Sequence, residues 1–195
     1  PFFSTHTPAN EIPLRLVGSE MCIRDRIWGL AEATFFFIVP DVLLSYIAIK
    51  NFKSAKIACI FATIGALIGG LIMYAWGQRN LESAETFLDK VPAISKEMLD
   101  DISLQVEDDQ GLAIFKGPLQ GQPYKAYAVY SGSDGIDYLS FILITIPARI
   151  IRFIITILLV NFLLNKILGK RKNVNKTLLL SCWWVIFYSA YFLLI

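Results

Sequence analysis

The run IACIFATIGALIGGLIMYAW, at residues 57–76, decides the fold class of this chain. It contains no charged side chain, and about 20 apolar residues are enough for an α-helix to cross the hydrocarbon core of a bilayer. Small residues recur along it at steps of four, three and four, namely Ala58, Ala62, Gly65 and Gly69, with Gly70 beside them. Because these residues share one helix face, the run predicts a membrane-spanning helix that packs closely against a second helix.

Two further apolar runs, at residues 138–164 and 177–195, are also long enough to span a bilayer. The chain of 195 residues is 55% hydrophobic and only 17% charged. Soluble domains usually carry about 25% charged residues to cover their surface. The charges of this chain also gather between its apolar runs. The pattern excludes a soluble enzyme and predicts an all-α integral membrane protein.

The apolar run at residues 27–49 has the length of a spanning helix, but it contains Glu32 and is interrupted by Pro40 and Asp41. Proline lacks the backbone N–H group that a continuous helix needs at such a position. Irregular backbone at membrane depth is tolerated only where protein covers it or where it lines a wet cavity. We therefore predict a broken helix or a re-entrant hairpin that turns near Pro40.

Residues 111–133 are too polar and too rich in glycine and proline to span a bilayer. Gly121, Pro123, Tyr124 and Lys125 lie at the centre of this segment. One interpretation is a loop. The other is a second re-entrant hairpin, because the stretch KAYAVYSG that follows is aromatic and weakly amphipathic.

Residues 78–110 form the most polar part of the chain, with many acidic and few basic side chains. Apolar residues recur at roughly helical steps on both sides of Pro92. We expect two short amphipathic helices outside the membrane, and we interpret their acidic side chains as a solvated face rather than a cation site.

Residues 1–26 differ in character from the rest of the chain. They are polar, show no sustained hydrophobic period, and lack the order of a signal peptide. Their stretch VGSEMCIRDR resembles translated sequencing-adapter read-through. We predict a disordered or non-native tail.

Basic residues predict the orientation of the spans. Clusters at residues 50–56 and 166–176 are expected on the cytoplasmic side. The two hairpins then enter the membrane from opposite sides, and each is followed by a spanning helix. The result is an inverted repeat with a first half at residues 27–77 and a second half at residues 111–165, an arrangement that places transport sites near the midplane. A basic loop and a terminal transmembrane helix complete the chain at residues 166–195.

Four charged residues lie within the apolar stretches: Glu32, Asp41, Arg149 and Arg152. An ionised side chain at the bilayer centre costs about 2.5–3.5 kcal/mol on insertion scales. The acids belong to the first half and the arginines to the second, so we predict that they meet at the interface between the halves. Two alternatives stay open: a static ion pair that fixes helix packing, or extension of Glu32 and Arg149 to a nearby membrane surface.

The sequence lacks the motifs of most enzymes. Its three cysteines form no CxxC spacing, and His6 is its one histidine. It contains neither HExxH nor GxSxG. We therefore expect no enzymatic activity, no metal site and no cofactor. A formal charge of +2 without a basic face also argues against nucleic-acid binding.

Three stretches resemble the DedA or VTT-domain (SNARE-associated) family of membrane proteins, particularly its YqaA-like branch. They are GLAEATFFFIVPDVLLSYIAIKNFKSAKIACIFATIGALIGGLIMYAWG, GPLQGQPYKAYAVYSG and FILITIPARIIRF. The resemblance covers most of residues 29–165 and implies two re-entrant hairpins that face one another. By position it matches Glu32 and Asp41 to the family's acids, and Arg149 and Arg152 to its arginine motif. The acids lie closer together here, and the proline precedes the arginines rather than separating them.

The resemblance implies a transporter that translocates or scrambles lipid, or a lipid-linked carrier, across a bacterial inner membrane. Expected partners are membrane lipids and protons, and a homo-oligomer is one arrangement left open. The predicted transport site comprises Glu32, Pro40, Asp41, Gly121, Pro123, Tyr124, Lys125, Arg149 and Arg152. Alternatives are a proton- or ion-coupled transporter of a small solute and a membrane scaffold that does not transport.

Overall fold

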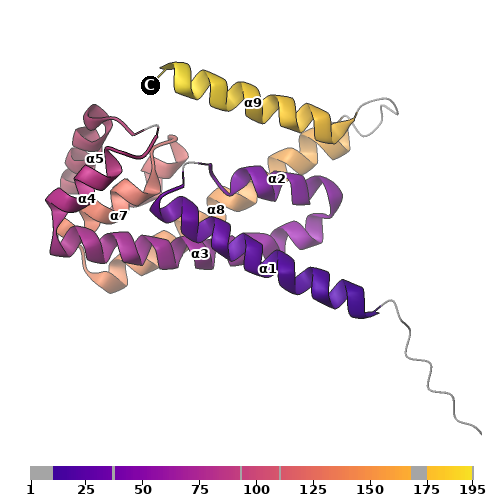
Figure 1. Cartoon of the computed structure of the whole chain (residues 1–195), viewed down its shortest axis with the longest axis horizontal. Coiled ribbons are helices and arrows are strands. Elements are labelled where there is room, and N and C mark those ends of the chain that lie inside the picture. Colours follow the sequence, from indigo (N-terminus) through magenta and orange to yellow (C-terminus); the bar gives the residue numbers. More distant parts are fainter. Residues whose placement is uncertain (1–10, 37, 93, 110, 168–174, 195) are drawn as a thin grey trace, which may run out of the picture.

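The chain is all-helical throughout the residues that the computed structural model describes, which are 11–36, 38–92, 94–109, 111–167 and 175–194 (Figure 1). Three helices are long and apolar enough to cross a membrane: α3 (Phe52–Arg79), α8 (Tyr138–Val160) with the first residues of the π-helix η2 (Asn161–Ile167), and α9 (Lys176–Leu194). The predicted helical class is therefore confirmed, and the three runs predicted to span a bilayer form helices of sufficient length and apolarity.

Helix α1 (Glu11–Thr34) begins within the segment that was expected to be a tail. The prediction of disorder is wrong for residues 11–26, which are helical. The end of this stretch packs on the fold, since Asp25 is buried and the backbone of Arg26 lies against Gly65. Packing of backbone on backbone requires no apolar period in the sequence. The hydrophobic pattern therefore did not predict the packing at Arg26.

The first apolar run is broken, as predicted. Helix α1 ends at Thr34, whose hydroxyl donates to the carbonyl oxygens of Leu30 at 2.9 Å and Ala31 at 3.2 Å. Helix α2 (Asp41–Lys50) begins directly after Pro40, where the missing N–H group of proline costs no helical hydrogen bond. The 24-residue helix α1 and the 10-residue helix α2 thus take the place of one span. In their connection Phe35 is 59% exposed, whereas Pro40 is buried.

Helix α3 follows α2 after Asn51, whose side chain accepts from the N–H groups of Lys53 and Ser54 and so caps the helix. The helix therefore begins before the predicted run and contains most of the expected basic connector. It is 28 residues long, or roughly 40 Å at 1.5 Å per residue, which exceeds the thickness of the hydrocarbon core.

The predicted small-residue seam of α3 is confirmed against α1. A Cβ atom built on Gly65 would lie 2.0 Å from the carbonyl oxygen of Arg26, and one on Gly69 would lie 2.7 Å from the Cβ of Ala33. Gly70 faces another neighbour, since its Cβ would lie 2.1 Å from the hydroxyl of Tyr124. Small residues on α3 therefore bring two different partners into contact with its backbone.

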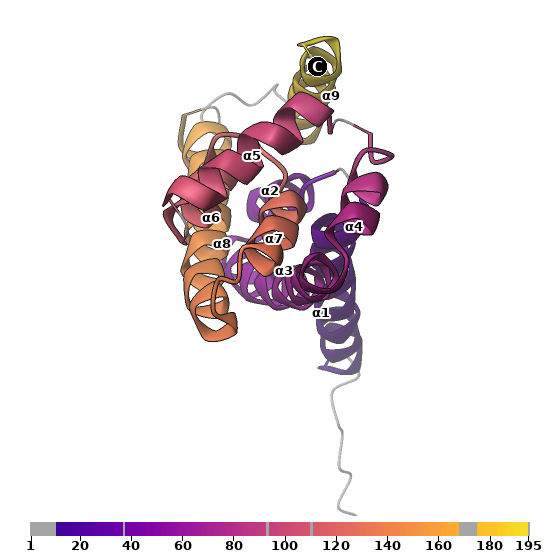
Figure 2. The same ribbon diagram turned by 90° about the vertical axis from the view of Figure 1, so that its left-hand side faces the viewer.

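The polar insert forms α4 (Leu81–Leu88) and α5 (Lys96–Asp109), on either side of Pro92 as predicted. The loop interpretation of the next segment is wrong for most of its length. It folds as α6 (Gly111–Lys116), the 3₁₀ turn η1 (Gly117–Leu119) and α7 (Tyr124–Ser133). Figure 2 shows α7 at the centre of the molecule, with α3, α4, α5 and α6 around it.

Candidate functional site

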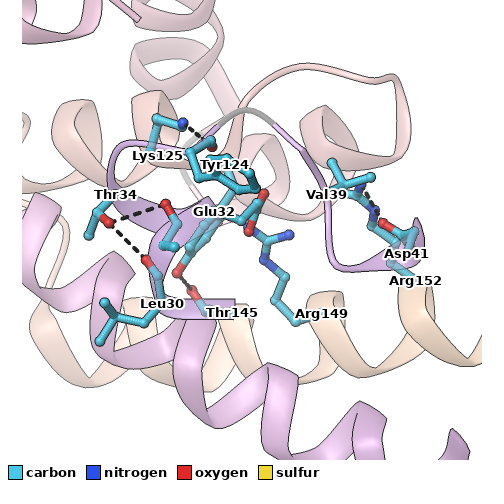
Figure 3. A network of polar contacts seen from close by, with 12 residues as sticks. Leu30, Glu32, Thr34, Val39, Asp41, Tyr124, Lys125, Thr145, Arg149 and Arg152 are labelled. Carbon is cyan, nitrogen blue, oxygen red and sulfur yellow. Dashed lines mark hydrogen bonds and ion pairs between the residues drawn. The ribbon is translucent and has the colours of Figure 1, made fainter. Parts of the chain in front are cut away.

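Two ion pairs join the first and second parts of the chain (Figure 3). The Arg149 Nη2 group donates to both carboxylate oxygens of Glu32, which lies in the last turn of α1. The distances are 3.2 Å to Oε1 and 3.0 Å to Oε2. The Arg152 Nη2 group donates to the Oδ2 atom of Asp41, at the start of α2, at 2.8 Å. The predicted meeting of acids and arginines is confirmed, because the break between α1 and α2 brings both acids to one face of α8.

The Arg149 pair is enclosed by protein. The exposed fraction is 1% for Arg149 and 5% for Glu32, which rules out the alternative that these side chains extend to a membrane surface. The guanidinium carbon of Arg149 lies 3.9 Å from the ring centroid of Tyr124 and 5.9 Å from that of Phe153. A cation over aromatic faces gains electrostatic stabilisation where water is excluded.

The hydrogen bonds of Arg149 are incomplete. One nitrogen, Nη2, makes both contacts with Glu32, and the Nε and Nη1 groups have no hydrogen-bond partner among the residues that the structure describes. Buried N–H groups without an acceptor are costly. The pair is therefore held by charge and by ring packing more than by a complete set of hydrogen bonds.

The Asp41 pair is better satisfied and more open. The hydroxyl of Thr156, one turn beyond Arg152 on α8, donates to the Asp41 Oδ1 atom at 2.7 Å. Asp41 also lies in the first turn of α2, where the helix dipole favours a negative charge. The side chain of Arg152 keeps 16% of its surface exposed. This pair can therefore exchange partners with a ligand at a lower cost than the Arg149 pair.

The connection between α1 and α2 contacts the start of α7. The buried Lys125 Nζ group donates to the carbonyl oxygen of Phe36 at 2.7 Å, so a cation of α7 caps the backbone at the break (Figure 3). Gly121, at φ +91°, makes the turn that precedes α7, and glycine adopts this backbone conformation at little cost. The two irregular connections thus meet at the ion pairs.

A cavity of about 550 Å³ opens beside these groups. Six of the predicted site residues line it: Glu32, Asp41, Gly121, Pro123, Lys125 and Arg152. Three others pack around it rather than along its wall, namely Pro40, Tyr124 and Arg149. Tyr124 fixes Arg149 through its ring and donates its hydroxyl proton to Thr145 at 3.4 Å. Ala62, Gly65 and Gly69 lie away from the cavity lining, in the seam where α3 packs against α1.

Sequence reasoning missed the contribution of α9. Four aromatic side chains of this helix line the cavity: Trp184, Phe187, Tyr188 and Tyr191. The Tyr188 hydroxyl accepts a hydrogen bond from the Val39 N–H group at 3.0 Å, which ties α9 to the connection between α1 and α2. The signal was present, because these residues recur at three- and four-residue steps. It was masked by aromatic residues on the other faces of the same helix.

No metal site emerges from the residues that the structure describes, since none of their His, Cys, Asp and Glu side chains form a group of three or more with suitable geometry. The chemistry available at the cavity is that of paired carboxylates, cationic donors and aromatic rings. Such a set can bind and orient a charged group.

No protein-family model matches the chain, and no solved structure matches it. An uncharacterized protein of Haemophilus influenzae (strain Rd) is 26% identical to the chain over 131 residues. The match covers 64% of this chain, and the chain spans 64% of the length of that relative.

Proposed function

We propose that this protein is a membrane transporter that moves a lipid, or a lipid-linked carrier, from one side of the bilayer to the other. The observation that carries the proposal is the cavity into which charged residues of α1, α2, α7 and α8 converge. The surface of α8 around them is apolar and exposed, as at Leu143, Ile151 and Leu158. A polar path next to a lipid-facing surface is what a headgroup needs if its chains stay in the hydrocarbon.

Two helix pairs support a re-entrant arrangement in this proposal. The end of α1 with α2 precedes the long helix α3, and α6 with α7 precedes the long helix α8. In Figure 1, the junction of α2 and α3 and the start of α9 lie at one end of the molecule, whereas α4 and α5 lie at the other. Basic residues at the first end and acidic residues at the second agree with the orientation predicted from charge. The two connections would then meet inside the membrane.

The charges of the site favour a negatively charged headgroup. Three cations, Lys125, Arg149 and Arg152, face two carboxylates, Glu32 and Asp41. One positive charge is therefore left without a carboxylate, and Lys125 is satisfied by a backbone carbonyl oxygen. A phosphate group of a lipid supplies the missing negative charge and forms charge-assisted hydrogen bonds with these donors.

Replacement of Arg152 by glutamine is expected to lower lipid flux about tenfold or more, because a charge-assisted donor to the headgroup is lost. The measurement is dithionite quenching of fluorescent phosphatidylglycerol in proteoliposomes, with protein-free liposomes as the baseline. Arg79→Gln is the matched control, since Arg79 is an exposed cation at the end of α3. Circular dichroism in detergent shows whether both variants keep the helical content of the wild type.

Flux that is equal in the folded Arg152→Gln variant and the wild type would contradict a role for this site in transport. The ion pairs would then serve packing alone, as in a membrane scaffold. Repeating the assay with a pH gradient separates lipid scrambling from proton-coupled transport. Flux that responds only to the gradient would favour the coupled mechanism.

A further inference from the structure

Helix α9 has an unusual position for a terminal span, because most of its side chains are exposed while one of its faces lines the cavity. Its link to the rest of the protein includes the Tyr188 hydroxyl at Val39 and the contact between the Ser181 and Tyr46 hydroxyl groups. Figures 1 and 2 both show α9 at the edge of the molecule, alongside the rest of the bundle. The helix therefore forms one wall of the cavity.

The indole of Trp184 carries a donor without a hydrogen-bond partner among the described residues. Its Nε1 atom is shielded from solvent and has no hydrogen-bond partner within the part of the chain that the structure describes. An indole N–H group can only donate, so its partner has to be an acceptor. In a bilayer no bulk water replaces that partner. Trp184 lines the cavity with part of its side chain, and a small rotation of the ring would present this shielded donor to a ligand there.

The surrounding rings define the rest of this wall. The rings of Phe187 and Tyr191 stack with their centroids 6.4 Å apart, and the Trp184 ring lies 5.6 Å from that of Phe187. Stacked aromatic rings offer an apolar surface, whereas the cationic groups Lys125 and Arg152 lie on other helices of the same cavity. The cavity thus combines donors for a headgroup with a surface for the start of a hydrocarbon chain.

We infer that α9 completes the lipid site, with the Trp184 indole donating a hydrogen bond to a phosphate oxygen of the headgroup while Phe187 and Tyr191 contact the adjoining chain. This inference rests on the proposed transport of lipid. It assigns to Trp184 a role in substrate selection. A lipid with a free acceptor at the phosphate is bound from both sides of the cavity, by the indole of α9 and by the cations of α7 and α8.

The neighbouring tryptophan provides a matched control. Trp183 is 63% exposed and lies outside the cavity lining, so it faces the surroundings of the protein. Trp184→Phe keeps an aromatic ring and removes the donor, and Trp183→Phe makes the same change one residue away. Incorporation of 3-benzothienylalanine at position 184 is a sharper variant, because sulfur replaces the N–H group within a ring system of nearly the same shape.

Two measurements distinguish lipid binding from lipid transport. The first is the thermal stabilisation of the purified full chain in detergent by short-chain phosphatidylglycerol, because a ligand that binds the folded state raises the unfolding temperature. The second is the flux of fluorescent phosphatidylglycerol in proteoliposomes. Loss of one hydrogen bond to the headgroup is expected to weaken apparent lipid binding about tenfold in both position-184 variants. Trp183→Phe is expected to match the wild type.

Equal lipid binding in the wild type and both position-184 variants would overturn the inference, even if wild-type flux is high. Weak binding in Trp184→Phe together with wild-type binding in the benzothienyl variant would also overturn it, because ring shape would then matter and the donor would not. If the wild type binds lipid through Trp184 but shows no flux, the binding site stands and the proposed transport fails.

Discussion

Replacing Arg149 by methionine is expected to lower the free energy of unfolding by about 3–5 kcal/mol, the cost of leaving a buried charge without its partner. Glu32 is 5% exposed and has the Arg149 guanidinium as its ion-pair partner. Methionine fills part of the volume beside Tyr124 and removes the cation. The measurement is unfolding of the detergent-solubilised protein by titration with sodium dodecyl sulfate, followed by circular dichroism.

The double variant Glu32→Gln/Arg149→Met is expected to regain much of the lost stability, because it removes the second charge as well. Arg79→Met is the control, since Arg79 is exposed at the end of α3 and should lose little. A loss in Arg149→Met that is no larger than in this control would show that the ion pair is not buried as described.

Replacing Gly65 by leucine is expected to cost about 3 kcal/mol or more, at the upper end of the range for overpacked cores. A Cβ atom at this position would lie 2.0 Å from the carbonyl oxygen of Arg26, so α1 and α3 have to separate. Even Gly65→Ala should destabilise the protein, although alanine normally stabilises a helix by up to about 1 kcal/mol relative to glycine. In the same unfolding titration, the diagnostic result is a lower free energy of unfolding for Gly65→Ala, opposite in sign to the ordinary effect of this substitution in a helix.

The control for the seam is the neighbouring residue Ile64, which is 40% exposed on another face of α3. Ile64→Leu should alter the free energy of unfolding only slightly, because it keeps the volume and lies outside the seam. A stabilising effect of Gly65→Ala, equal to its ordinary effect on helix propensity, would show that the two helices do not touch at this point.

The sequence predicted those features that follow from a local pattern or a local cost. Apolar length predicted α3, α8 and α9, and the stripe of small residues predicted the seam. The cost of ionised groups at membrane depth predicted that Glu32 and Asp41 would meet the two arginines. Their function stays a prediction, because pairing is compatible with both transport and packing.

Features held by tertiary contacts could not be read from the sequence. The segment at residues 111–133, which includes α7, left a loop and a re-entrant hairpin open because it is polar and rich in glycine and proline. In the structure, polar atoms of α7 find distant partners. Lys125 donates to the carbonyl of Phe36, and the Tyr130 hydroxyl donates to Glu85 at 2.9 Å. The middle of α1 is another case, since its backbone at Arg26 packs on Gly65 without an apolar period.

The cavity wall formed by α9 could not be predicted from the sequence for a third reason. A terminal helix rich in aromatic residues is expected to face lipid on all sides, and most of α9 does. Besides the contact between Ser181 and Tyr46, the hydrogen bond from the Val39 N–H group to Tyr188 holds one aromatic face toward the α1–α2 connection. This contact joins residues 149 positions apart in the sequence, a separation at which no local pattern gives information.

The proposed transport requires that a lipid headgroup passes through the cavity between the two helix connections and α9. Phosphatidylglycerol with a photoactivatable diazirine on its headgroup tests this directly in proteoliposomes, when labelled peptides are mapped by mass spectrometry. We predict labels at residues 39–41 and 121–125, where the connections line the cavity. Labels confined to the exposed isoleucines of α3, such as Ile60 and Ile68, would mark surrounding bilayer lipid alone and contradict the claim.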